Sequence, residues 1–215
     1  METKTQILIF PLLLTFVLFI SNTKNTAAST TATATTTTTT AATKTSNKTY
    51  RNYLKTACKS TTYPKLCYSS LSSYSSIIKT DDLILCTTAL NVSLQISINT
   101  SYFMTDLSNQ QELSETEAEV VQDCIDEIGD SIYELNQSLS DLSSLDFNSS
   151  DVRFQISNIK TWVSAAITDD YGCTDGFDGT KVSSAVKSKI KKAILNVSRI
   201  TSNALALVNQ KLSFP

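Results

Sequence analysis

The sequence predicts an all-α protein, an up-and-down four-helix bundle preceded by a disulfide-closed N-terminal helical hairpin. The chain of 215 residues has no proline between Pro64 and Pro215, and three of its four glycines lie close together, at Gly172, Gly176 and Gly179. Turns and sheet connections normally need more of both residues. Apolar residues recur at gaps of three and four in four separate stretches, which is typical of one buried face of a helix. Runs of period two, which would indicate strands, are not found.

The first 28 residues have the layout of a secretory signal peptide. Lys4 precedes an apolar run from Ile7 to Ile20, and small and polar residues follow through Ala28. A membrane span needs about 20 apolar residues, so this run is short for an anchor, and no second run of its length follows. We predict a signal peptide over residues 1–28 and a secreted protein with no membrane segment after cleavage. An uncleaved anchor is the alternative.

Residues 29–49 are predicted to be a Thr-rich disordered spacer, followed by one domain over residues 50–215. From Ser29 to Thr45 the chain is nearly all Thr and Ala, so it lacks the large apolar side chains that offset the entropy of ordering. Asn-x-Ser/Thr sequons agree with secretion. The glycosylation candidates are Asn47, Asn91, Asn99, Asn136, Asn148 and Asn196.

The hairpin is expected around Cys58 and Cys67, which have Pro64 between them. A single helix through both would separate them by about 13 Å, which is beyond the reach of a disulfide. A bond between them therefore requires the chain to turn back, and we predict a small helical hairpin closed by that bond.

The four bundle helices are expected from four apolar stripes. The stripes are Leu85, Ala89, Val92, Ile96, Phe103; Ala118, Val121, Ile125, Ile128, Ile132, Leu135, Leu139, Leu142; Val152, Ile156, Ile159, Val163, Ala166; and Val186, Ile190, Ala193, Val197, Ile200, Ala204, Leu207. Ser114 and Glu117 form a capping box before the second stripe. Thr80 or Asp81, Ser150 and Thr180 are the N-cap candidates of the other three helices.

Three further cysteines lie in or near these helices. Cys124 stands among the second stripe and Cys173 follows the third. A bond between them would close a loop of about 50 residues and stabilise by roughly 4 kcal/mol in the chain-entropy model. Cys86 is left over in an apolar segment, where a buried free thiol behaves as a small hydrophobe. Pairing with another chain and a redox role are the alternatives.

Catalysis is not expected of this chain. It has no histidine, so the commonest general base and metal ligand are missing. Nothing in the sequence separates the pKa values of Asp169 and Asp170 as acid and base roles require, and no base accompanies a cysteine nucleophile. No cofactor or metal is predicted. The net charge of −2 and the lack of a basic run exclude nucleic acid as a partner.

Function is therefore expected on a surface, and an acidic row is the candidate. Asp123, Glu127, Asp130 and Glu134 recur at gaps of four, three and four, on the side opposite the second apolar stripe. The row is either a solvated face or a partner-binding face. The single tryptophan, Trp162, is either part of the core or an interface anchor.

Several strings of residues occur together in one order. They are Cys58-Lys-Ser-Thr-Thr-Tyr-Pro-Lys-Leu-Cys67 with Ser70-Leu71, Asp123-Cys124, Thr161-Trp162-Val163-Ser164-Ala165-Ala166, Cys173-Thr174-Asp175-Gly176-Phe177, and Ser202-Asn203-Ala204-Leu205-Ala206-Leu207. From about Tyr50 onward the chain resembles the plant invertase and pectin methylesterase inhibitor family. The resemblance implies a four-helix bundle after a helical hairpin, with disulfides from Cys58 to Cys67 and from Cys124 to Cys173. It also implies docking of the second, third and fourth bundle helices over the active-site cleft of the target enzyme.

The resemblance also indicates the target. Tyr63-Pro64 and Thr161-Trp162 are similar to the pectin methylesterase branch, whereas invertase inhibitors carry a Pro-Lys-Phe element ahead of the third helix, where this chain has the stretch from Leu145 to Ser150. We expect a secreted cell-wall inhibitor that binds pectin methylesterase one to one; inhibition of acid invertase is the alternative. The expected partner-binding residues are Asp123, Glu127, Asp130, Glu134, Trp162 and Asp175. The same module precedes the catalytic domain of some esterases, but since this chain ends at Pro215 we expect a free-standing inhibitor. A helical carrier of apolar ligands and a structural wall protein are the remaining alternatives.

Overall fold

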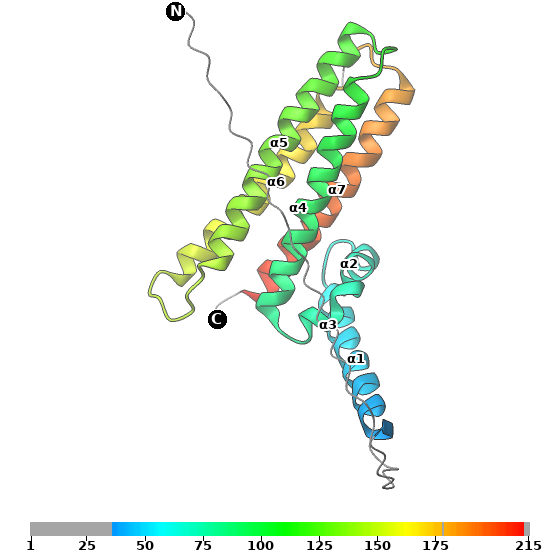
Figure 1. Cartoon of the computed structure of the whole chain (residues 1–215). Coiled ribbons are helices and arrows are strands. Elements are labelled where there is room, and N and C mark those ends of the chain that lie inside the picture. Colours follow the sequence, from blue (N-terminus) through cyan, green and yellow to red (C-terminus); the bar gives the residue numbers. More distant parts are fainter. Residues whose placement is uncertain (1–35, 178, 213–215) are drawn as a thin grey trace, which may run out of the picture.

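The computed structural model describes residues 36–177 and 179–212, and all regular structure in these ranges is helical. Four long helices lie side by side (Figure 1): α4 (Asp82–Ser108), α5 (Glu115–Ser143), α6 (Val152–Asp175) and α7 (Ser184–Lys211). Each contacts two neighbours, in the order α4, α5, α6, α7 and back to α4. The short connections make consecutive helices antiparallel. The predicted up-and-down four-helix bundle is confirmed.

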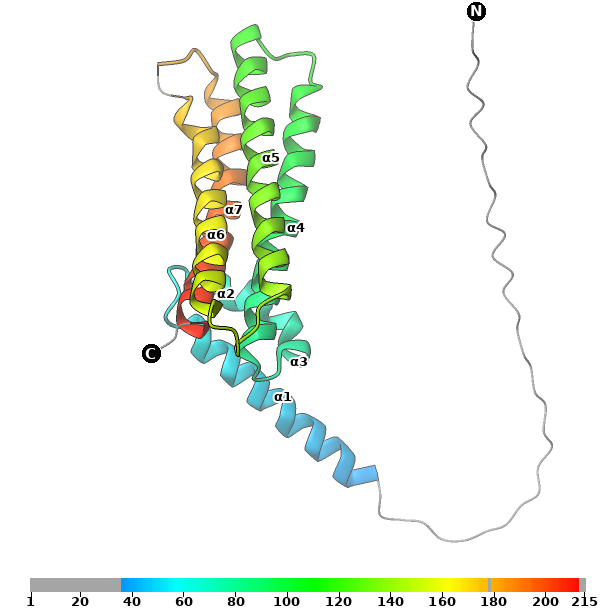
Figure 2. The same cartoon turned by 90° about the vertical axis from the view of Figure 1, so that its left-hand side faces the viewer.

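The N-terminal segment differs in part from the expectation. The predicted signal peptide, residues 1–28, lies outside the described residues. Helix α1 (Thr36–Cys58) begins inside the range 29–49, so from Thr36 onward that range is helical rather than disordered. The helix is fixed at its other end, where Leu54 and Ala57 are buried, and extending a fixed helix costs far less than nucleating one. Figures 1 and 2 show the first turns of α1 pointing away from the bundle.

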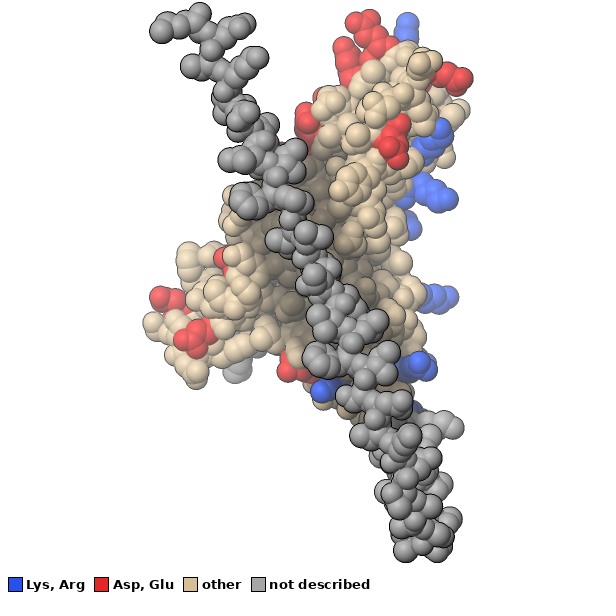
Figure 3. Space-filling model, in the orientation of Figure 1, with Lys and Arg blue, Asp and Glu red and all other residues tan. Residues whose placement is uncertain are grey.

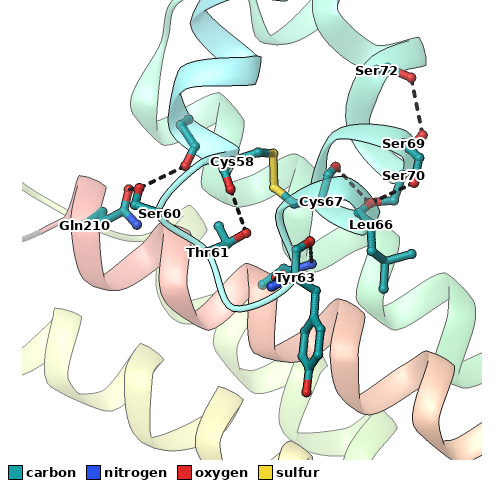
Figure 4. The surroundings of a disulfide bond; sticks show 12 residues. Cys58, Ser60, Thr61, Tyr63, Leu66, Cys67, Ser69, Ser70, Ser72 and Gln210 are labelled. Carbon is teal, nitrogen blue, oxygen red and sulfur yellow. Dashed lines mark hydrogen bonds between the residues drawn. A yellow bond between two sulfur atoms is a disulfide. The ribbon is translucent and has the colours of Figure 1, made fainter.

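The predicted helical hairpin is formed by α1 and α2 (Pro64–Leu71), with η1 (Ser72–Tyr74) and α3 (Ser75–Ile78) leading into the bundle. Pro64 is the first residue of α2, where its missing N–H costs nothing. Cys58 and Cys67 are joined by a disulfide across the turn, with 5.6 Å between their Cα atoms (Figure 4). The disulfide-closed hairpin is confirmed.

The hairpin is held against α7 by side-chain hydrogen bonds (Figure 4). The backbone N–H of Tyr63 donates to Oδ1 of Asn203 at 2.8 Å, and Nδ2 of Asn203 donates back to the Tyr63 carbonyl at 3.1 Å. Asn203 is buried, so both of its polar atoms have partners away from water. Ser60 Oγ adds a bond to Gln210 Oε1 at 2.8 Å. The loop between the two cysteines therefore has a fixed position on α7.

The helix starts follow the sequence signals in two cases of four. Asp81 caps α4 by accepting from the Ile84 N–H at 2.9 Å, and Ser114 and Glu117 form the predicted capping box of α5. Helix α7 is capped by Ser183, not Thr180, because the Thr180 hydroxyl bonds the Phe177 carbonyl one turn back. Helix α6 starts after Asp151, not Ser150, and has no side-chain cap.

The core consists of two apolar clusters, one at each end of the bundle. One cluster includes the hairpin together with Leu135, Ile159 and Leu207, and the other includes Met104, Ile128 and Ile190. Between them in all four helices lie buried polar residues, which we call the polar waist: Ser97, Thr100, Ser131, Asp170, Ser198 and Thr201. The bundle therefore changes from apolar to polar and back to apolar along its axis.

The buried face of α4 differs from the predicted stripe. Phe103 is exposed, while Ser93, Ser97 and Thr100 face the interior. The hydroxyls of Ser93 and Ser97 bond the carbonyl oxygens four residues before them, at 3.1 and 3.2 Å, so they need no partner from another helix. Helix α4 is the one described helix whose length and mean hydropathy of 1.3 would allow a membrane span; such values are shared by core helices, and α4 packs against α5 and α7.

Chemical labelling of the cysteines is expected to follow their burial. The structure contains a second disulfide, Cys124 to Cys173, with 4.4 Å between the Cα atoms, and Cys86 is a free, fully buried thiol whose pKa burial raises to about 12. We expect unreduced peptide mapping to yield the two bonded pairs, and iodoacetamide to modify Cys86 only in denaturant. Modification of Cys86 in the native protein, or its recovery in a bonded peptide, would contradict this assignment.

Candidate functional site

The acidic row of α5 is divided between solvent and the neighbouring helix. Asp123 and Asp130 are exposed, but Glu127 and Glu134 are partly buried. Glu127 points at α6, since a Cβ atom placed on Gly172 would lie 2.7 Å from its Oε2. Glu134 lies beside Asp169 of α6, and its buried Oε2 has no hydrogen-bond partner. The expectation that all four lie opposite the apolar stripe is therefore wrong for Glu127 and Glu134, because α6 packs against that side of α5.

An acidic hollow lies between α5 and the C-terminal end of α6. It has a volume of about 230 Å³, and four of the residues that line it are the carboxylates Asp123, Asp126, Glu127 and Asp130. Gly172 forms part of the α6 wall, and a side chain there would collide with Glu127. The Cys124–Cys173 bond fixes the two helices beside it. The hollow thus holds several negative charges against a rigid wall.

A second group of acids continues into the bundle at the polar waist. Asp170 is fully buried, and the Ser131 hydroxyl donates to its Oδ1 at 2.9 Å, while its Oδ2 has no hydrogen-bond partner. Burial raises the pKa of Asp170 to about 7. Burial and then the neighbouring Asp169 raise the pKa of Glu134 to about 8, and burial raises that of Glu127 as well. In mildly acidic solution Asp170 and Glu134 are therefore largely protonated, so the exposed acids carry most of the charge.

The start of α5 is tied to the start of α7 by one carboxylate. Glu117 accepts hydrogen bonds from the backbone N–H of Ser114 at 3.0 Å and of Ser183 at 2.9 Å. These bonds from Ser183 and Ser114 lower the pKa of Glu117 to about 2. The end of the bundle that carries the acidic hollow is therefore held by this carboxylate as well as by a disulfide.

Trp162 lies near the middle of α6, away from the end that carries the acidic hollow. It is half-buried, and its Nε1 donates to Oδ2 of Asp141 on α5 at 3.1 Å. Its ring meets the exposed ring of Tyr133 edge to face, with 6.4 Å between the centroids. Trp162 is thus neither a core residue nor a free anchor, but a bridge between α6 and α5 with one aromatic neighbour open to solvent.

The expected partner-binding residues share one face but form two groups. Asp123, Glu127 and Asp130 line the hollow, and Asp175, which is exposed, ends α6 two residues after Cys173. Trp162 forms the second group with Tyr133, which follows Asp130 by only three residues on α5. The α5–α6 face therefore offers negative charge at one end and aromatic surface next to it, in the middle of the two helices.

Sequence reasoning missed three acidic residues at or beneath this face. Asp126 lines the hollow. Asp169 and Asp170 are the carboxyl neighbours of Glu134 on α6. Asp170 continues the stripe Val152 to Ala166 by four residues, and Asp126 precedes Asp130 by four, so both follow helical spacing. Asp170 was excluded because the stripe was followed through apolar residues only.

The other predicted positions are accessible. All six sequon asparagines are exposed; Asn148 lies in the connection between α5 and α6, and Asn47, Asn91, Asn99, Asn136 and Asn196 lie in helices. In residues 36–177 and 179–212 no three His, Cys, Asp or Glu side chains are placed to hold a metal ion. The geometry of the face suits binding to another macromolecule.

Comparison with known proteins agrees with this arrangement. Residues 52–207 match the model of the family described as plant invertase/pectin methylesterase inhibitor. The chain is 45% identical to pectinesterase inhibitor 4 of Arabidopsis thaliana over 170 residues, which cover 77% of this chain and 85% of that protein. It is 38% identical to the 21 kDa protein of Daucus carota, with 73% and 82% of the two chains covered.

The fold is also similar to a solved structure. A mutant form of a pectin methylesterase inhibitor from Arabidopsis superposes with a TM-score of 0.59 over 74% of this chain and 96% of that one, at 16% identity. Members of the matched family are inhibitor proteins rather than catalysts. Because the family model spans the hairpin and nearly all of the bundle, the chain belongs to the plant invertase/pectin methylesterase inhibitor family.

Proposed function

We propose that this protein inhibits a pectin methylesterase by laying its α5–α6 face over the active-site cleft of the enzyme. The observation that carries the proposal is its similarity to proteins named pectinesterase inhibitors across most of both chains. The accompanying geometry is suitable, since the face combines the acidic hollow with the Tyr133–Trp162 pair. Aromatic anchors and complementary charge are what stable interfaces use.

Electrostatics supports this side of the bundle. An enzyme that handles a polyuronate has reason to carry positive potential near its cleft. Asp123, Asp126 and Asp130 stand exposed on α5 around the hollow and would meet that potential without losing hydrogen bonds inside the bundle. The partly buried Glu127 and Glu134 would contribute less, because burial favours their neutral forms.

The connection before α6 favours the esterase over invertase as the target. Invertase inhibitors carry a Pro-Lys-Phe element at this place, and the connection here, residues 144–151, contains neither proline nor lysine. Secretion fits the same proposal, because residues 1–28 read as a signal peptide and two disulfides persist only in an oxidising compartment. The protein would therefore act in the cell wall.

Parallel titration of two enzymes tests the proposal. Purified protein is added to a plant pectin methylesterase and to a plant acid invertase at fixed enzyme concentration. We expect esterase activity to fall linearly to an end point at one inhibitor per enzyme, and invertase activity to stay unchanged. Inhibition of invertase alone would transfer the proposal to the other branch of the family, and an end point far from one would contradict the one-to-one complex.

A further inference from the structure

A basic groove lies on the side of the bundle away from the α5–α6 face, between the hairpin and α7. It has a volume of about 1260 Å³, and the charged residues that line it are all cations: Lys65 on α2, and Lys189, Lys191, Lys192 and Arg199 on α7. Figure 3 shows Lys and Arg side chains along the edge of the molecule where α7 and the hairpin lie. Asp and Glu are absent from the described lining.

These cations have no carboxylate partners in the structure. All five are exposed, and in the described part of the chain none of them lies within 4.0 Å of an Asp or Glu oxygen; the ion pair found there, Lys211 with Asp82, belongs to the base of the hairpin. The whole chain has a net charge of −2. A cleft lined by one sign of charge focuses the potential, so this groove attracts anions although the protein as a whole is acidic.

The wall of the groove opposite α7 is rigid. Tyr63 is fixed by its two hydrogen bonds with Asn203, and the loop that carries it is closed by the Cys58–Cys67 bond. The guanidinium of Arg199 lies 5.3 Å from the centre of the Tyr63 ring. Phe103, the residue expected in the core, lines the groove as well. The groove therefore presents aromatic and apolar surface between its cations. Because this wall is already fixed, little conformational entropy is lost when a ligand binds.

The cations are spread along a line. From Lys189 to Arg199 the ten residues correspond to roughly 15 Å along α7, and Lys65 faces them from the other wall. A compact anion would meet one or two of these charges. A linear polymer with a carboxylate on every unit can meet several at once, and its sugar rings offer apolar C–H faces to Tyr63 and Phe103.

We propose that the basic groove binds de-esterified polygalacturonate, so that the inhibitor is held on the wall polymer. The proposal rests on the proposed function, because this polymer is the product of the esterase that the α5–α6 face would inhibit. The methyl-esterified substrate lacks the negative charges and binds weakly. The groove lies on α2 and α7 and the acidic hollow on α5 and α6, so the hollow stays open when the groove is filled.

Binding to oligogalacturonates without esterase tests the groove alone. The full secreted chain is titrated by calorimetry with an unesterified oligomer of about ten sugars and with its methyl ester, before and after enzymatic removal of N-glycans, because the sequon residue Asn196 lines the groove. We expect binding of the free acid in at least one state, and at least tenfold weaker binding of the ester. Failure to bind the free acid in either state at low ionic strength overturns the proposal.

A matched pair of variants locates the site. Lys65→Gln with Lys189→Gln and Lys192→Gln is expected to weaken binding at least tenfold. The control, Lys48→Gln with Lys55→Gln and Lys181→Gln, has the same net charge and changes exposed residues outside the groove, so it should stay within twofold of the parent. Equal losses in the two triples, or equally tight binding of polyglutamate, would show unspecific attraction and overturn the proposal. Loss of esterase inhibition with intact oligomer binding would count against the proposed function only.

Discussion

Replacing Asp170 by asparagine is expected to prevent much of the loss of stability that the parent protein shows between about pH 4 and pH 7. Asp170 is fully buried, and burial raises its pKa from the ordinary 3.8 to about 7. Over this interval the folded protein keeps a proton that the unfolded chain releases. The free energy of unfolding therefore falls as the pH rises, by up to about 1.4 kcal/mol per pH unit and at most about 4 kcal/mol in total.

Asparagine keeps the shape of the protonated acid and still accepts the Ser131 hydrogen bond, so the variant should match the parent near pH 4. Urea unfolding at several pH values gives the slope of the free energy of unfolding against pH. The slope of the variant should be smaller by the amount that corresponds to the release of about one proton. Glu134 and Glu127, whose pKa values are also raised, leave a residual slope of the same sign. Asp126→Asn on the exposed side of α5 is the control and should keep the parent slope. Identical slopes for parent and Asp170→Asn would contradict the assignment.

Acid lowers the stability of the protein through Glu117, at the start of α5. Hydrogen bonds from Ser183 and Ser114 lower the pKa of Glu117 to about 2, so its contribution is present above the ordinary value of 4.5 and is lost as the pH falls towards 2. The buried acids make the protein less stable as the pH rises, and Glu117 makes it less stable as the pH falls. We therefore expect the protein to be most stable between these two ranges, in mildly acidic solution.

Charge reversal at the acidic hollow is expected to abolish most of the inhibition of the esterase. Asp123→Lys with Asp130→Lys replaces two exposed carboxylates, so the melting temperature should change little. If the hollow faces positive potential on the enzyme, the inhibition constant should rise at least tenfold, equivalent to about 1.4 kcal/mol. Glu127 is left unchanged, because its packing against Gly172 would confuse stability with binding.

The matched control places the same charge change elsewhere. Asp106→Lys with Glu112→Lys alters two exposed acids at the end of α4 and in the connection to α5. It should inhibit like the parent at low ionic strength, where exposed charges act most strongly. A hollow variant that inhibits as well as this control would mean that the row is only a solvated face.

The fold could be predicted because its signals are local. The stripe from Val152 to Ala166 is buried along its whole length, and the capping box at Ser114 and Glu117 forms as expected. The face of α4 could not be predicted in this way. Serine and threonine hydroxyls that bond their own helix behave as small interior residues, and the apolar pattern gives no sign of this. Phe103 was therefore placed in the core although it lies in the basic groove.

The candidate site was predicted only in part, because it is made by two helices. Helical spacing put Asp123 and Asp130 on one side of α5, but it could not show that α6 covers Glu127 and Glu134. The contacts of Glu134 with Asp169 and of Trp162 with Asp141 join residues 35 and 21 positions apart. The basic groove was missed for the same reason: Lys189, Lys191 and Lys192 are close in the sequence, but only the packing of the hairpin on α7 brings Lys65 opposite them.

The polar waist has a consequence for how the molecule opens. Each apolar cluster is closed by its own disulfide, Cys58–Cys67 at one end and Cys124–Cys173 at the other, and the buried polar side chains of the waist separate the two. Amide hydrogen exchange should therefore separate two subglobal units, with exchange accelerated at their boundary near Ser97, Ser131 and Ser198. The hairpin end can then fray while the acidic end stays folded, and a bound esterase would slow exchange mainly in the second unit.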